Sequence, residues 1–190
     1  MTTVTIPEWS AKGLLPPINP VQPASAERSP YLVDLLDVVM RFATSAERRR
    51  VLLGLLDYRA ALHNAGLVDG FQWLDGSFME QVERLENRAP RDVDVVTFVN
   101  VPDDFAPSDD DLAALNHDAV KEQFLVDSYL VELNLLPADN LVRKSAYWYS
   151  MWSHRRNQDW KGYLQIDLNP IHDKEARSYL IRVDNAGAWS

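Results

Sequence analysis

The chain contains no cysteine, no apolar run of membrane-spanning length and no excess of basic residues. Without cysteine it has neither a disulfide framework nor a thiolate metal site, so its composition gives no sign of a secreted scaffold, and zinc would need other ligands. No apolar run approaches the ~20 residues of a membrane span. The amino terminus also lacks the basic-then-apolar layout of a signal peptide. We therefore expect a cytoplasmic protein that does not contact membranes.

Basic residues are outnumbered, with 19 Lys and Arg against 28 Asp and Glu and a formal net charge of -9. Broad, sequence-independent binding of nucleic acid depends on neutralising phosphates with Lys and Arg. The charge balance argues against that kind of binding. A local basic patch could still hold the end of one strand.

The composition that is present, 46% hydrophobic and 25% charged over 190 residues, is that of one ordinary globular domain. Six of the eleven prolines fall in residues 1–30, where they oppose helix and central strand. We predict a proline-rich N-terminal arm over 1–30, anchored by a few apolar side chains, and a domain over 31–190. Helical spacing of apolar residues then predicts helices over 30–42 and 44–66, the second capped by Thr44.

The most informative stretch is 72–100. It reads as an apolar strand, a Gly76-Ser77 turn, a short polar helix and a second apolar strand that carries Asp92 and Asp94. Alternate residues of a strand share a face, which places these two carboxylates on the same side, about 7 Å apart along the strand. Val93 and Val95 then face the core, and the two acids can share a divalent metal such as Mg²⁺.

The turn suits the phosphate end of a ligand. Gly76 lets the backbone approach closely, and Ser77 adds a hydroxyl to the N–H groups at the start of the following helix. Each motif alone has a plain structural interpretation, as a solvated strand edge or a simple turn. Their order within one short stretch favours a site.

Together these residues resemble the nucleotidyltransferase superfamily, which has the polymerase-beta-like fold. The family pattern is an apolar strand ending in Gly-Ser, then a helix, then Asp-x-Asp between apolar residues; residues 74–78 and 92–96 match it. The resemblance implies a nucleoside triphosphate substrate and Mg²⁺ or Mn²⁺ held by the aspartates. Some members have a basic residue after Gly-Ser, whereas Met79 and Glu80 follow Phe78 here.

A narrower resemblance is to an uncharacterised group of small prokaryotic and phage-associated proteins in that superfamily, which includes the transferases of toxin–antitoxin modules. It covers most of the chain and rests on five motifs: Ile6-Pro7, Gly13 to Pro17, Arg48-Arg49-Arg50, Trp73 to Phe78, and Lys161-Gly162. The Arg triplet has two interpretations, a solvated helix face or one arginine that reaches a phosphate or an acidic partner.

A third acid lies in the segment 123–133, whose β-branched and aromatic content predicts a strand. Alternation places Asp127 in an otherwise apolar row with Tyr129 and Val131. The resemblance implies that Asp127 is the third carboxylate of the site, one that helps to hold the metal and activates the attacking hydroxyl. The alternative is a buried aspartate satisfied by a neighbouring Tyr or Lys.

Two lysines complete the candidate site. Residues 139–156 predict an aromatic and basic helix, in which Lys144 precedes Trp148 by one turn. The rings are best explained by packing, and the functional alternative has one ring stacking on a base while Lys144, Arg155 or Arg156 meets a phosphate. Lys161 begins a late strand predicted over 161–168 and is a second candidate cation for the nucleotide.

The elements predict an α/β or α+β single domain, a small mixed β-sheet flanked by helices, as in the nucleotidyltransferase fold. The leading hypothesis is a Mg²⁺-dependent nucleotidyltransferase that moves a nucleoside monophosphate to a hydroxyl of a protein, an RNA end or a small molecule. The alternative is a catalytically silent binding protein on the same fold, such as an antitoxin-like or defence-system subunit, or a nucleotide sensor. So small a protein would need a protein partner, a second copy of itself or its own arm to select a substrate.

Overall fold

The computed structural model describes residues 3–187. The first two residues of the predicted arm and residues 188–190 of the predicted domain lie outside that range. The fold is a mixed α+β arrangement around one five-stranded sheet of order β1-β5-β2-β3-β4. Its elements, in chain order, are β1 (Tyr31–Leu32), α1 (Leu35–Phe42), α2 (Ala46–Asn64), β2 (Gly70–Asp75), η1 (Ser77–Met79), α3 (Val82–Glu86), β3 (Val93–Val99), α4 (Asp109–Ala114), α5 (His117–Phe124), β4 (Val126–Glu132), α6 (Ala138–Trp152), β5 (Leu164–Asp167), η2 (Pro170–His172) and α7 (Asp173–Gly187).

The sheet mixes parallel and antiparallel pairs. The central strand β2 runs antiparallel to both β3 and β5, whereas β3 and β4 run parallel, as do β1 and β5. Parallel neighbours need a long crossover, and the chain between β3 and β4 supplies one that contains α4 and α5. Within the described residues, no helix is long and apolar enough to cross a membrane.

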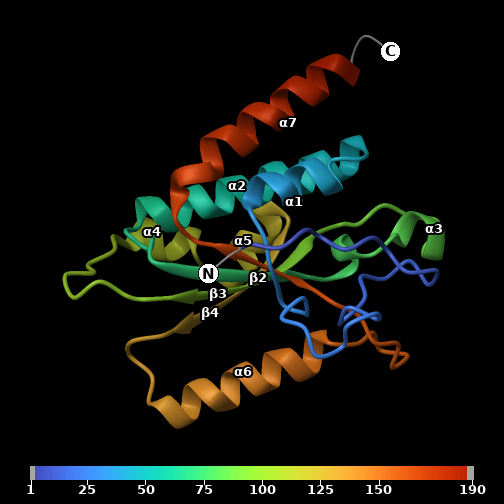
Figure 1. Ribbon diagram of the computed structural model, residues 1–190. Helices are drawn as coiled ribbons and strands as arrows, with labels where there is room; N and C mark the ends of the chain where they lie inside the picture. The colour runs from blue at the N-terminus through green and yellow to red at the C-terminus, as the bar shows by residue number, and fades with distance from the viewer. Residues whose placement is uncertain (1–2, 188–190) are drawn as a thin grey trace.

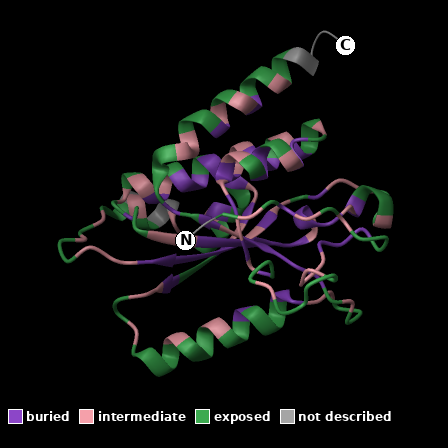
Figure 2. Ribbon diagram, in the orientation of Figure 1, coloured by how far each residue is buried: buried purple, intermediate pink, exposed green. Residues whose placement is uncertain are grey.

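Helices cover the two faces of the sheet unequally. Figure 1 shows α1, α2 and α7 stacked over one face, and α6 alone across the other. The outer surface of α6 is largely exposed, whereas the strands are largely buried (Figure 2). The face under α6 is therefore covered by fewer helices than the opposite face.

Each face has its own apolar core. The larger core joins α1, α2, α5 and α7 to one side of the sheet and includes Val93 and Val95, so the prediction that these two valines face the core is confirmed. The smaller core lies under α6 and includes Val96, Phe98 and the buried Trp148 and Trp152. The packing interpretation is thereby confirmed for these two α6 rings.

Several predicted boundaries were wrong. The helix predicted over 30–42 begins at Leu35, because the chain first adds the short strand β1 to the edge of the sheet. The cap of α2 is Ser45 and not Thr44, since the Ser45 hydroxyl accepts the N–H of Arg48. Residues 123–124, predicted as strand, end helix α5, and β4 begins only at Val126.

The proline-rich segment contains no helix or strand over residues 3–30, apart from one isolated bridge between Ile18 and Arg28. It nevertheless packs closely on the rest of the chain. Leu14 and Leu15 are almost fully buried, Leu15 belongs to the larger core, and the Trp9 indole N–H donates to the Met79 carbonyl at 2.8 Å. The segment is thus part of the same folded body.

Candidate functional site

Three aspartates stand side by side across three strands. In β2 and β3 Asp75 pairs with Asp94, and in β3 and β4 Asp94 pairs with Asp127. Paired residues of neighbouring strands share a face, and this is the face that carries Val96 and packs against α6. The fold therefore gathers three carboxylates from distant parts of the chain into one row.

The turn after β2 lies directly against this row. Gly76 has φ of +85°, a conformation that L side chains rarely adopt. A Cβ at this position would stand 2.9 Å from Cγ of Asp94. Glycine is therefore required twice, for its backbone conformation and for its approach to the carboxylate. Ser77 follows at once, in the short η1 turn that lines the cleft.

Some of the backbone N–H groups of this turn form hydrogen bonds within the turn itself. Those of Met79 and Glu80 donate to the carbonyls of Gly76 and Ser77, at 3.3 and 3.2 Å. The remaining hydrogen-bond donors of the turn are consequently the Ser77 hydroxyl and the N–H groups of Ser77 and Phe78.

Negative charge is concentrated around Asp94. Its burial, and then the carboxylates of Asp92 and Asp127, raise its pKa to about 6. Lys121 of α5 offsets part of this charge, since its Nζ forms an ion pair with Asp127 and lies 3.5 Å from Oδ2 of Asp92. The hydrogen bond to Asp127 raises the pKa of Lys121. His117 Nε2 lies 3.7 Å from the other Asp127 oxygen.

A second group of charges is buried beside Asp75. Lys161 Nζ lies 3.0 Å from Oδ1 of Asp75 and 3.2 Å from Oε1 of Glu80, while Arg155 Nε lies 3.1 Å from the second Glu80 oxygen. Burial raises the pKa of Asp75 to about 7 although Lys161 opposes the shift. Burial alone would lower the pKa of Lys161, but its two carboxylate partners raise it above the ordinary value.

Arg48 holds the loop that carries these residues. It is 1% exposed and donates to the carbonyls of Phe78 and Glu80 at 2.7 and 2.6 Å. Its remaining guanidinium N–H groups bind both oxygens of Glu83, at 2.6 and 2.9 Å. The first arginine of the triplet thus meets an acidic partner within the protein and fixes the turn after β2, whereas Arg50 is exposed.

The N-terminal motifs support the same region. The N–H of Gly162 donates to the carbonyl of Leu15 at 2.7 Å, and the N–H of Gln81 donates to the carbonyl of Gly13 at 2.9 Å. A Cβ on Gly162 would stand 2.5 Å from the carbonyl oxygen of Pro16. The motif at 13–17 and the Lys161-Gly162 pair are therefore in direct contact.

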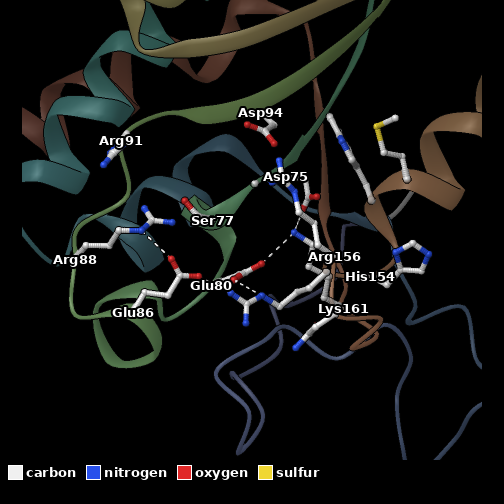
Figure 3. A pocket seen from close by; sticks show the side chains of 15 residues that line it. Asp75, Ser77, Glu80, Glu86, Arg88, Arg91, Asp94, His154, Arg156 and Lys161 are labelled. Carbon is white, nitrogen blue, oxygen red and sulfur yellow. Dashed lines mark hydrogen bonds and ion pairs between the residues drawn. The ribbon is translucent and has the colours of Figure 1, made fainter.

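These elements surround a cleft of about 860 Å³. In Figure 3, Asp75 and Asp94 lie between Arg88 and Arg91 on one side and His154 on the other. Five Lys or Arg side chains line it against four acidic ones, in a chain where acids predominate: Arg88, Arg91, Arg155, Arg156 and Lys161 against Asp75, Glu80, Glu86 and Asp94. An acidic floor with a basic rim suits a phosphorylated ligand that arrives with a divalent cation.

The row of acids fits such a cation in its chemistry. Carboxylate oxygens are the ligands that Mg²⁺ prefers, and Oδ1 of Asp127 is buried without a hydrogen-bond partner among the described residues. As the side chains stand, no group of three or more His, Asp or Glu within residues 3–187 is arranged to hold a metal ion. Lys121 takes that position between Asp92 and Asp127, so a cation would have to displace it.

Most of the residues predicted for the site come together. Gly76, Ser77, Asp94 and Lys161 line the cleft, while Asp92 and Asp127 lie within electrostatic reach of Asp94. Asp92 immediately precedes β3 and is not inside it. Lys161 is 6% exposed and is held by two acids. Lys144 is exposed on α6 and does not line the cleft.

Sequence reasoning missed the residues that complete the site. Asp75 is given no role in the sequence prediction, although it is the last residue of strand β2 and immediately precedes Gly76. The sequence shows that Glu80 stands near the position where some nucleotidyltransferases have a basic residue. It does not show that Glu80 is the partner of Lys161 and Arg155. The basic rim residues Arg88 and Arg91 fall in a loop without periodicity, and only the fold brings them to the cleft.

Comparison with known proteins places the chain in one family. Residues 7–167 match the model described as Family of unknown function (DUF6932), and the chain belongs to that family. Neither the curated proteins nor the solved structures contain a match to it.

Proposed function

We propose that this member of a family of unknown function is a Mg²⁺-dependent nucleotidyltransferase with a nucleotidyltransferase-like fold. The observation that carries the proposal is the row Asp75, Asp94 and Asp127, in register across three strands and adjacent to the Gly76-Ser77 turn. Two of these carboxylates, Asp75 and Asp94, line the cleft together with the Gly76-Ser77 turn. Carboxylates beside a turn that can bind phosphate are the two parts that metal-assisted phosphoryl chemistry needs.

The reaction transfers a nucleoside monophosphate to an acceptor hydroxyl. The hydroxyl oxygen attacks the α-phosphorus of a nucleoside triphosphate and forms a new P–O bond. The bond from that phosphorus to the oxygen bridging toward the β-phosphate breaks, and pyrophosphate leaves with its electron pair. Asp127 accepts the hydroxyl proton, because its buried Oδ1 has no hydrogen-bond partner among the described residues.

The remaining roles follow from position. Asp92, Asp94 and Asp127 would hold Mg²⁺, or Mn²⁺, once Lys121 is displaced, and the ion would supply positive charge to neutralise the phosphates and the leaving oxygen. Ser77 and the start of the turn bind the triphosphate. Arg88 and Arg91 on the cleft rim supply the positive charge that a basic residue after Gly-Ser provides in some nucleotidyltransferases.

Transfer is tested with two labels. Protein, Mg²⁺ and cell extract are incubated with nucleoside triphosphate labelled at the α-phosphorus or, separately, at the γ-phosphorus. The proposal predicts that the α-label becomes attached to an acceptor and the γ-label appears in pyrophosphate. Asp94→Asn abolishes both, while Asp139→Asn, an exposed change on α6, leaves both unchanged. Equal transfer by folded Asp94→Asn would rule the proposal out.

A second candidate function is supported by Lys121. Its ion pairs with Asp92 and Asp127 offset part of the charge of these acids without any metal, as a catalytically silent binding protein or nucleotide sensor on this fold would require. In that case neither label is transferred, and the Asp94→Asn protein still binds its protein partner. Turnover of both labels by the wild type would exclude the silent alternative.

A further inference from the structure

A second hollow continues the cleft outward along the end of α6. It has a volume of about 540 Å³ and is lined by Met151, His154, Arg155, Arg156, Gln158 and Trp160. Four of these residues, Met151, His154, Arg155 and Arg156, also line the cleft with the acidic floor. The two hollows therefore form one groove, which we call the α6 groove, that leads from the surface toward the aspartates.

The α6 groove presents an aromatic ring to solvent. Trp160 is 63% exposed, whereas Trp148 and Trp152 on the adjoining helix are buried. Its position is fixed, since Trp160 forms a backbone bridge with His154 and the His154 ring meets the indole edge-on at 6.4 Å. An exposed indole on a well-bonded loop is a platform that is available for stacking.

Positive charge lies next to this platform. Arg156 is exposed and has no ion-pair or hydrogen-bond partner within the described part of the chain. Arg155 is held at the mouth of the cleft by Glu80 and Glu86, at 3.1 and 2.6 Å. On a protein of net charge -9, a groove that combines an open indole with an uncommitted guanidinium is complementary to a ligand with both rings and negative charge.

We propose that the α6 groove binds a short single-stranded nucleic acid, which is the acceptor of the transfer. One base stacks on Trp160, the neighbouring phosphate meets Arg156, and the strand end enters the cleft toward Asp94. Stacking on an aromatic ring beside a guanidinium is how proteins hold single strands without reading sequence. This proposal names the acceptor of the proposed reaction. The role of the strand as acceptor therefore rests on the proposed transferase function.

Nucleic acid is favoured over an acidic peptide by the shape of the site. Trp160 is 63% exposed and shares its hollow with polar and charged side chains, so this hollow is not an enclosed apolar pocket for a peptide side chain. The acidic remainder of the surface confines contact to a few nucleotides. With one or two phosphates neutralised, the affinity falls with salt at a slope of only about -1 on a logarithmic plot.

The test is fluorescence anisotropy of a labelled ten-nucleotide RNA and its DNA counterpart, titrated with full-length protein in EDTA and without nucleotide. These conditions separate the groove from catalysis, because failure of metal-dependent transfer leaves strand binding intact. The variants are Trp160→Ala, Trp160→Phe and Arg156→Ala. The control is Arg50→Ala, which removes the same charge from an exposed position on α2, across the sheet from α6.

The proposal predicts micromolar to submillimolar binding that Trp160→Ala weakens about tenfold, within the range of one lost stacking contact. Trp160→Phe retains most of the affinity. Arg156→Ala weakens binding and reduces the salt slope by about 0.7, and Arg50→Ala changes neither. Circular dichroism confirms that each variant is folded.

Two results would overturn strand binding in the α6 groove, and a third would overturn its role in transfer. One is no strand binding by folded wild type at any concentration up to about 1 mM. The other is equal binding of an acidic peptide, unaffected by Trp160→Ala, which would make the groove a site for a protein partner or a plain anion patch. Strand binding with intact transfer to proteins only would overturn the acceptor role in particular.

Discussion

Asp75 makes the stability of this protein depend on pH in an unusual direction. Its carboxyl is 2% exposed, and burial raises its pKa to about 7 in the folded chain, from an ordinary value of 3.8. The folded state therefore binds a proton between these two values that the unfolded state does not. Stability from this group is present at low pH and is lost as the pH rises through about 7.

The magnitude follows from the shift. Each pKa unit corresponds to about 1.36 kcal/mol, and about pH 5.5 lies roughly 1.5 units below the folded pKa. We expect the free energy of unfolding to fall by about 2 kcal/mol between about pH 5.5 and about pH 8.5 on account of Asp75. In Asp75→Asn this decrease is absent, because the amide does not titrate.

Urea denaturation at a series of pH values measures the effect, and it is carried out without divalent metal. The comparison is between wild type, Asp75→Asn and Asp139→Asn, whose side chain is exposed on α6. The control variant should keep the slope of the wild type. If Asp75→Asn shows the same fall in stability across this range as the wild type, the assignment of the raised pKa to buried Asp75 is refuted.

Three further predictions concern the loop, the cation position and the turn. Arg48→Met should destabilise the protein by about 2–4 kcal/mol, since two buried carbonyls lose their donor while the partly exposed Glu83 returns to water; a change in unfolding free energy below 1 kcal/mol would contradict this. Lys121→Met should tighten Mn²⁺ binding about two- to fivefold by calorimetry, the modest effect of removing a competing and partly exposed charge, and weaker binding would mean that Lys121 does not compete. Gly76→Ala should abolish triphosphate binding while the fold survives, because the new Cβ meets the Asp94 carboxylate; unchanged affinity would remove the turn from the site.

The face of the sheet on which each residue of 93–99 lies can be predicted from the sequence. Alternation within residues 93–99 was enough to place Val93 and Val95 in the core and Asp94 on the opposite face. The in-register contact of Asp94 with Asp127 could not be read in the same way, because it depends on a parallel crossover through α4 and α5. The alternation of apolar and polar residues predicts which side chains share one face of a strand. It does not predict which other strand lies beside it.

The ends of helices and strands, and the partners of buried charged residues, are harder to predict from the sequence. Phe124 has strong strand propensity but ends α5, since Leu125 takes a left-handed conformation that terminates the helix before β4. Arg48 looked like part of a solvated face, yet it is the residue of its triplet that points inward. Lys161 is 81 positions from Glu80 in sequence, and no periodicity connects residues so far apart.

The central claim is that Asp92, Asp94 and Asp127, with the Gly76-Ser77 turn, bind a nucleoside triphosphate together with Mg²⁺. It is tested most directly by calorimetric titration of each nucleoside triphosphate into the wild type and into Asp92→Asn/Asp94→Asn, with Mg²⁺ and with EDTA. The account predicts binding of at least one triphosphate to the wild type that requires Mg²⁺ and disappears in the double variant. Absence of binding by folded wild type, or equal binding in EDTA and by the double variant, would contradict it.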